Sequence, residues 1–183
     1  MGIFSAILGK QSLGEIINET KNNLFEIYQI KNPTNAETFN AILMITIAGV
    51  AMINDVAKGK ANFLIDKLSQ EAKQLTNSLT FEIREVANSD EEVIAIYEVL
   101  PPDMQGDEGL RINGGVAFPS IFNSIGPNFV TEILQNSEGE FGSPGYAGII
   151  IGDALLGRDE SIPYFAQTVM EMNNLLKKII KTI

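Results

Sequence analysis

Apolar residues recur at the three- and four-residue spacing of an α-helix in three segments of the first third of the chain. The spacing predicts helices at about 12–30, 35–57 and 61–75. Ser12-Leu13-Gly14-Glu15 opens the first as a capping box, and Asn35 is the expected N-cap of the second. Because short connections favour antiparallel neighbours, residues 12–76 form one predicted helical unit.

The second of these helices is apolar on all sides. Its residues 41–53 form a run of thirteen that only Thr46 interrupts. A bilayer span needs about 20 such residues, so the run indicates a helix at the centre of a protein core. Residues 1–10 have no basic stretch ahead of their apolar residues, which argues against a secretory signal. We therefore expect a cytoplasmic protein with no transmembrane segment.

The middle of the chain shows a different pattern. Residues 79–86 alternate apolar and polar side chains, as a half-buried strand does. Residues 92–100 are rich in β-branched side chains, although their start also resembles a helix cap, so strand and helix both stay open there. We favour a hairpin across 87–91, followed by a further extended segment at 110–118.

The last third is predicted to be helical again. Two short helices are expected at 120–125 and 127–135, and one long amphipathic helix at 161–182, whose apolar seam runs from Phe165 to Ile183. This seam suits the core of a monomer and the interface of a homodimer equally well. Between these helices lies an expected glycine-rich loop containing Gly139, Gly142, Gly145 and Gly148.

These patterns together predict a single domain, residues 1–183, of the mainly α class. It is a bundle of long amphipathic helices from 12–76 and 119–183, with a small antiparallel β element within 79–118. An all-α bundle is the alternative. A domain of this size buries roughly 70% of the surface of its unfolded chain, so its core needs no disulfide or metal.

Charge is segregated along the chain. Residues 81–160 contain fifteen Asp and Glu against three Arg, whereas residues 1–80 balance seven Lys against seven acids, and the whole chain carries −10. This distribution predicts an acidic surface over the middle of the chain, which favours a basic protein partner and disfavours nucleic acid. The lysines near the end of the chain, Lys177, Lys178 and Lys181, suit the negative end of the last helix dipole.

The chain contains neither histidine nor cysteine. Their absence excludes disulfides, thiolate nucleophiles, zinc and iron–sulfur sites held by cysteine, histidine metal sites and Ser-His-Asp triads. Any catalysis would depend on carboxylates, Lys, Tyr, Ser or Thr. The composition therefore favours a protein without enzymatic activity and without a cofactor.

The candidate motifs fail against their templates. The glycine series has neither Gly-x-Gly-x-x-Gly nor a following Gly-Lys-Ser/Thr, and the acids that flank it would repel phosphate. An EF-hand beginning at Asp103 would have Glu108 where glycine is required and Gly114 where glutamate is required. A flexible or tightly turned connection and a solvated acidic loop are the simpler interpretations.

Carboxylates are the remaining candidate site residues. Glu15, Glu19 and Glu26 lie at helical spacing on a polar face, where they are expected to be solvated. Asp55 lies near the end of the apolar helix, where Lys58 or Lys60 is its expected partner. The acids most exposed to a partner are expected in the two middle loops; they are Asp90, Glu91, Glu92, Asp103, Asp107 and Glu108.

Three functions follow from this reading. The first is a non-enzymatic cytosolic interaction or regulatory module whose acidic surface binds a basic partner. The second is a small-molecule or lipid-binding helical domain, with a pocket between the central helix and residues 149–156. The third is a carboxylate-dependent enzyme that uses Mg²⁺.

Overall fold

The computed structural model describes the backbone of residues 11–58, 62–88, 95–99 and 110–182, and the side chains of all of these except 83–88 and 95–99. The fold is mainly α with a small antiparallel β element, which confirms the predicted class. Its elements, in chain order, are α1 Leu13–Ile27, α2 Asn35–Ala57, α3 Asn62–Thr76, β1 Thr80–Asn88, β2 Ala95–Val99, β3 Leu110–Asn113, α4 Gly114–Gln135, α5 Gly142–Leu156, α6 Arg158–Ser161, the 3₁₀ turn η2 Ile162–Tyr164 and α7 Phe165–Ile180.

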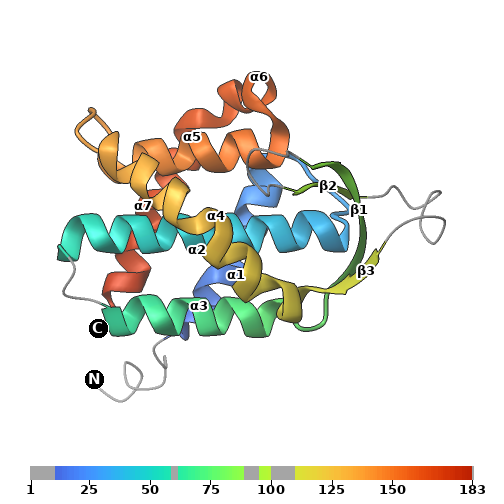
Figure 1. Cartoon of the computed structure of the whole chain (residues 1–183). Coiled ribbons are helices and arrows are strands. Elements are labelled where there is room, and N and C mark those ends of the chain that lie inside the picture. The colour runs from blue at the N-terminus through green and yellow to red at the C-terminus, as the bar shows by residue number, and fades with distance from the viewer. Residues whose placement is uncertain (1–10, 59–61, 89–94, 100–109, 183) are drawn as a thin grey trace, which may run out of the picture.

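Helix α2 is the centre of the bundle and contacts α1, α3, α4, α5 and α7. Figure 1 shows α3 and α5 on opposite sides of α2, with α4 crossing in front and α1 and α7 behind. The sheet covers the end of the bundle where α2 begins, and there the Asn35 amide donates a hydrogen bond to the carbonyl of Thr80. Helices α4, α5 and α7, from the second half of the chain, therefore pack around a helix from its first third.

Burial of α2 within the protein confirms the sequence prediction for its apolar run. Fourteen of its 23 residues are buried, from Phe39 to Ile53. By length and composition α2 is also the one helix in the described part of the chain that could cross a membrane, and 78% of that stretch is buried inside the protein. A cytoplasmic location stays a prediction.

Capping boxes fix the starts of α1 and α2. The Ser12 hydroxyl accepts a hydrogen bond from the Glu15 amide at 3.1 Å, and the Glu15 carboxylate accepts one from the Ser12 amide at 2.7 Å. At α2 the N-cap is Thr34, which pairs with Glu37 in the same way. The prediction of Asn35 as the cap was therefore wrong by one residue, because only a cap at Thr34 places a glutamate three residues later.

The end of α1 contains a strained residue. Gln29 has a φ of 59°. Its amide donates a hydrogen bond to the carbonyl of Glu26, and the amide of Ile30 donates one to the carbonyl of Phe25. This is the Schellman arrangement, in which the left-handed position normally holds glycine. Replacing Gln29 by glycine is expected to raise the free energy of unfolding by about 0.5–1 kcal/mol, since the left-handed conformation costs side-chain-bearing residues about that much. Urea unfolding measures the gain, and Gln29→Ala, which keeps the strain, is the control expected to show none.

The sheet has three antiparallel strands in the order β2-β1-β3. Ile83 pairs with Val99 and Thr80 pairs with Asn113, with a bulge in β1 between Glu85 and Ala87. The pairing of β1 with β2 confirms the predicted hairpin and resolves residues 95–99 as a strand. The connection that includes residues 89–94 lies outside the described residues.

One continuous helix replaces the segments expected between 110 and 135. The predicted extended segment ends at Asn113, whose side chain accepts a hydrogen bond from the Val116 amide and so caps α4. The two short predicted helices are parts of α4, which contains both Pro119 and Pro127. An interior proline costs roughly 3 kcal/mol, and here burial of the apolar face of α4 against α2 and α3 outweighs it.

The predicted glycine-rich loop was wrong, because Gly145 and Gly148 lie within α5. A Cβ atom on Gly148 would lie 3.2 Å from Cγ2 of Val169, and one on Gly152 would lie 2.8 Å from Cβ of Ser161. These glycines therefore allow α5 to pack closely against α6 and α7. The long helix predicted from residue 161 begins at Phe165, after the 3₁₀ turn that contains Pro163.

Candidate functional site

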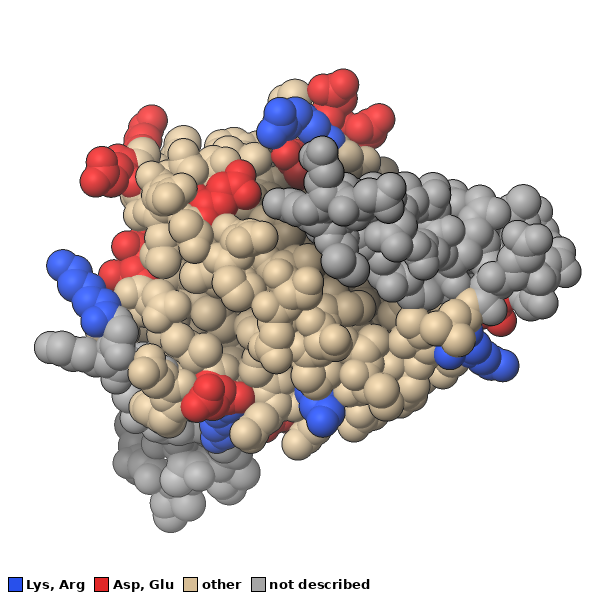
Figure 2. Space-filling view, in the orientation of Figure 1, with Lys and Arg blue, Asp and Glu red and all other residues tan. Residues whose placement is uncertain are grey.

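None of the six acids predicted to bind a partner can be placed, because Asp90, Glu91, Glu92, Asp103, Asp107 and Glu108 lie outside the described residues. The later acids of the same region are described. Five of them are exposed, and we call them the acidic rim: Glu138 and Glu140 precede α5, Asp159 and Glu160 follow it, and Glu132 of α4 accepts a hydrogen bond from the Tyr146 hydroxyl of α5 at 2.8 Å. Figure 2 shows acidic side chains in red at the upper left and the upper right of the molecule, with one more acidic group and uncharged surface between them.

A groove runs between α5 on one side and α6, η2 and α7 on the other, with a volume of about 580 Å³. Its apolar lining comes from Ile149, Ile162 and Phe165. Ile149 is 36% exposed and Ile162 67% exposed, which is unusual for large aliphatic side chains. Phe141 extends this apolar surface, because its ring meets that of Phe165 edge to face at 5.8 Å and is itself 53% exposed.

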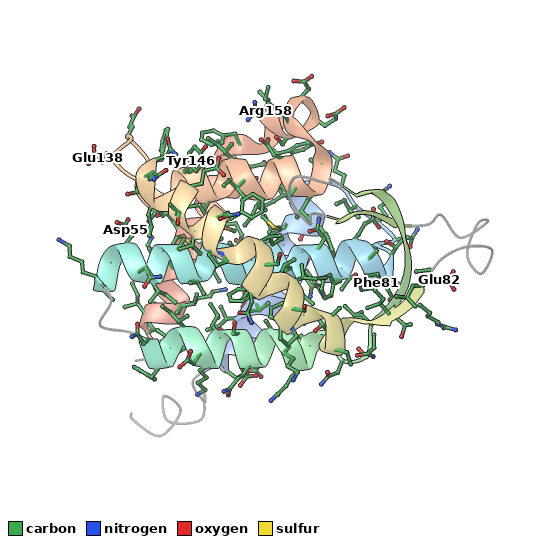
Figure 3. The ribbon with its side chains drawn as sticks, viewed as in Figure 1. Asp55, Phe81, Glu82, Glu138, Tyr146 and Arg158 are labelled. Atoms are coloured by element: carbon green, nitrogen blue, oxygen red, sulfur yellow. The ribbon has the colours of Figure 1, made fainter. Side chains whose placement is uncertain are left out.

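The polar end of the groove is built around Asp153. One carboxylate oxygen accepts a hydrogen bond from Nε of Arg158 at 3.3 Å, and the other lies 3.2 Å from the Ser161 hydroxyl. The carbonyl of Arg158 lies nearer the same hydroxyl, at 2.9 Å, and competes with Asp153 for its single proton. The Arg158 side chain is 81% exposed, so its ion pair with Asp153 contributes little to stability and is readily exchanged. Figure 3 shows Arg158 and Glu138 at opposite ends of α5, with Tyr146 between them.

Beneath the groove lies a buried hydroxyl pair. The Thr168 hydroxyl donates to the carbonyl of Tyr164 at 3.0 Å and lies 2.9 Å from the hydroxyl of Tyr28. Since a threonine hydroxyl has one proton, Tyr28 is the donor to Thr168. Burial raises the pKa of Tyr28 to about 12, and the charge of Asp153 acts in the same direction. This pair joins α1 to α7 directly behind the groove.

Tyr28 is expected to make the protein less stable at high pH. Its pKa is about 12 in the folded protein against 10.0 when unperturbed, so the unfolded chain releases this proton first. The stability from Tyr28 is therefore complete below pH 10 and is lost between pH 10 and pH 12, by roughly 2–3 kcal/mol. Urea unfolding of the native protein and of Tyr28→Phe at several pH values measures this, because the difference between the two should shrink over that range. A constant difference would contradict it.

The other candidate carboxylates of the sequence do not form a catalytic pair within the described residues. Glu15 belongs to the cap of α1, and Glu19 binds Nζ of Lys178 at 2.7 Å, which lowers the pKa of Glu19 together with a hydrogen bond from Gln11. Asp55 is half-buried at the end of α2, and no ion pair joins it to Lys58 within the described residues. Nor do three or more acidic side chains group around a metal site in that part of the chain.

Sequence reasoning missed the groove. It considered residues 149–156 only as a wall facing the central helix, which suits the buried Ile150 and Ile151, whereas Ile149 faces outward. The signal was present in the spacing, because Ile149 and Asp153 lie four residues apart on one face of α5, and Phe141, at its N-cap, lies eight residues before Ile149. The interpretation of this stretch as a loop hid that pattern.

The residues of the C-terminal seam pack within one copy of the chain, since Val169, Met172 and Ile179 are buried. A homodimer through α7 stays a prediction.

Comparisons with known protein families, with curated proteins and with solved structures found no match to this chain.

Proposed function

We propose that the protein is a non-enzymatic interaction module whose acidic rim binds a basic protein partner. The observation that carries this proposal is the exposure of the five rim carboxylates beside α5. Between residues 112 and 176 the chain has seven acids and a single basic residue, Arg158, which already pairs with Asp153. The rim therefore presents negative charge with little neutralisation from its own surroundings.

Charge of this kind acts mainly on the rate and selectivity of association. A negative surface steers a positive partner towards it and repels acidic competitors, and the effect weakens as salt screens it. The residues of the groove agree with a binding role. They include Asp153 and Ser161, but the chain has no histidine that could act as the general base for the serine hydroxyl.

Binding of a fluorescent oligolysine peptide tests the proposal. Fluorescence anisotropy should show binding at about 50 mM NaCl that weakens about tenfold by about 200 mM. Reversing both α6 charges, Asp159→Lys with Glu160→Lys, should weaken binding about fivefold at the lower salt concentration.

The matched control is the pair Glu26→Lys with Asp66→Lys. It alters net charge by the same amount at two exposed positions, on α1 and on α3, that are not part of the acidic rim. Equal losses from the two pairs would show that total charge, and not the rim, attracts the peptide. Binding that ignores salt would also contradict the proposal.

A further inference from the structure

We infer that the groove between α5 and α7 receives the apolar face of a cationic amphipathic helix, so that the basic partner is recognised through a segment of this kind. This inference rests on the proposed function and adds the chemistry of the partner. The groove is lined by the apolar side chains of Ile149, Ile162 and Phe165, and exposed acids lie just before and just after α5, the helix that forms one of its walls. Protein interfaces share this arrangement, with few charges at the centre and polar groups at the margin.

The apolar surface here is more than isolated exposed residues. Of the nine large apolar side chains that are exposed in the described part of the chain, Phe141, Ile149 and Ile162 belong to this one surface. Phe165 joins them, because it contacts Phe141 and lines the groove with the two isoleucines. Exposed apolar side chains that form one contiguous surface, bordered by charged groups, mark interaction sites more often than single exposed residues do.

The acids before and after α5 indicate which kind of segment would bind in the groove. Glu138 and Glu140 precede α5, and Asp159 and Glu160 follow it. The fifteen residues of α5 span about 22 Å at 1.5 Å per residue. A helix of about 15 residues with an apolar stripe along one face and basic residues at both ends would match both features. A basic side chain at one end would also meet Asp153, in exchange for Arg158.

Two synthetic peptides of identical composition test the inference. Both have about 15 residues with two lysines at each end; in one the leucines follow i, i+3, i+4 and i+7, and in the other they are dispersed around the helix. The first peptide is expected to bind the protein about tenfold more tightly, because only it can place its leucines together in the groove. Fluorescence anisotropy at low salt measures both affinities.

Substitutions in the protein test whether the difference in affinity between the two peptides arises in the groove. Ile162→Ser should remove most of the difference between the two peptides, about fivefold, whereas Met170→Ser, which is equally exposed at 67% but lies outside the groove, should preserve it. Ile149→Ser provides a second variant, and circular dichroism verifies that each variant is folded.

The outcomes separate the two proposals. If both peptides bind equally and only the rim substitutions weaken them, the acidic surface binds basic partners but the groove does not receive a helix. If neither peptide binds, both proposals fail. If light scattering shows a dimer that Ile162→Ser converts to a monomer, the groove is covered by a second copy of the chain, and the inference is overturned.

Discussion

Replacing Phe118 by alanine is expected to lower the free energy of unfolding by about 3–5 kcal/mol. The Phe118 side chain is 1% exposed and stacks on Phe122 at 5.7 Å, while its edge-to-face contact with Phe39 is 6.2 Å between ring centroids. Phe39 in turn lies 5.0 Å from Phe81 of the sheet. Removing Phe118 leaves a cavity at the place where α2, α4 and β1 meet, and loses the aromatic pairing as well.

The same substitution at an exposed position is the control. Phe63 is 62% exposed at the start of α3, so Phe63→Ala should change stability by less than about 0.5 kcal/mol. Thermal unfolding should show a fall of roughly 6–20 °C for Phe118→Ala. A loss below about 1 kcal/mol would mean that the aromatic cluster does not hold the sheet to the bundle.

Leu68→Ala is expected to lower the free energy of unfolding by about 2–5 kcal/mol, because Leu68 is fully buried between α3 and α2. Its partner across the interface is Gly49. A Cβ atom on Gly49 would lie 2.8 Å from Cδ2 of Leu68 and 3.4 Å from Cδ1 of Ile179. Gly49→Ala alone should therefore destabilise the protein by about 1 kcal/mol, since the new methyl group finds no room.

The two substitutions together are expected to interact. Once Leu68 is alanine, the methyl group of Gly49→Ala enters the space that leucine left, and alanine is the better helix former by about 1 kcal/mol. Gly49→Ala should then stabilise the Leu68→Ala protein, with a coupling energy of about 1–3 kcal/mol. Urea unfolding of the four proteins measures the cycle. Additive effects would show that the two side chains do not share this space.

Local patterns predicted the parts of the fold that depend on local chemistry. The stripe of α1, its capping box and the all-round apolarity of α2 each follow from neighbours in sequence, and each is present. The hairpin of β1 and β2 was also predictable, because alternation marks one strand and β-branched residues mark the other.

Long-range packing decided what the sequence alone left hidden. An asparagine followed by two glycines, as at Asn113, is equally typical of a turn and of a helix N-cap. Only the presence of α4 after it shows that Asn113 is a cap. Gly148 and Gly152 resemble loop residues until Val169 and Ser161 are seen against them. The acidic partner surface expected from charge segregation stays a prediction, and the groove required knowing that α5 is a helix and which of its faces points outward.

The central position of α2 affects how the chain folds during synthesis. Its apolar surface is completed by α5 and α7, and contacts such as that of Tyr28 with Thr168 join residues 140 apart in sequence. At ribosomal speeds of 5–20 residues per second, about 6–25 s separate the emergence of residue 57 from that of residue 180. Throughout this interval the apolar surface of α2 that later packs against α5 and α7 is uncovered, so we expect the nascent chain to depend on holding chaperones until those helices emerge.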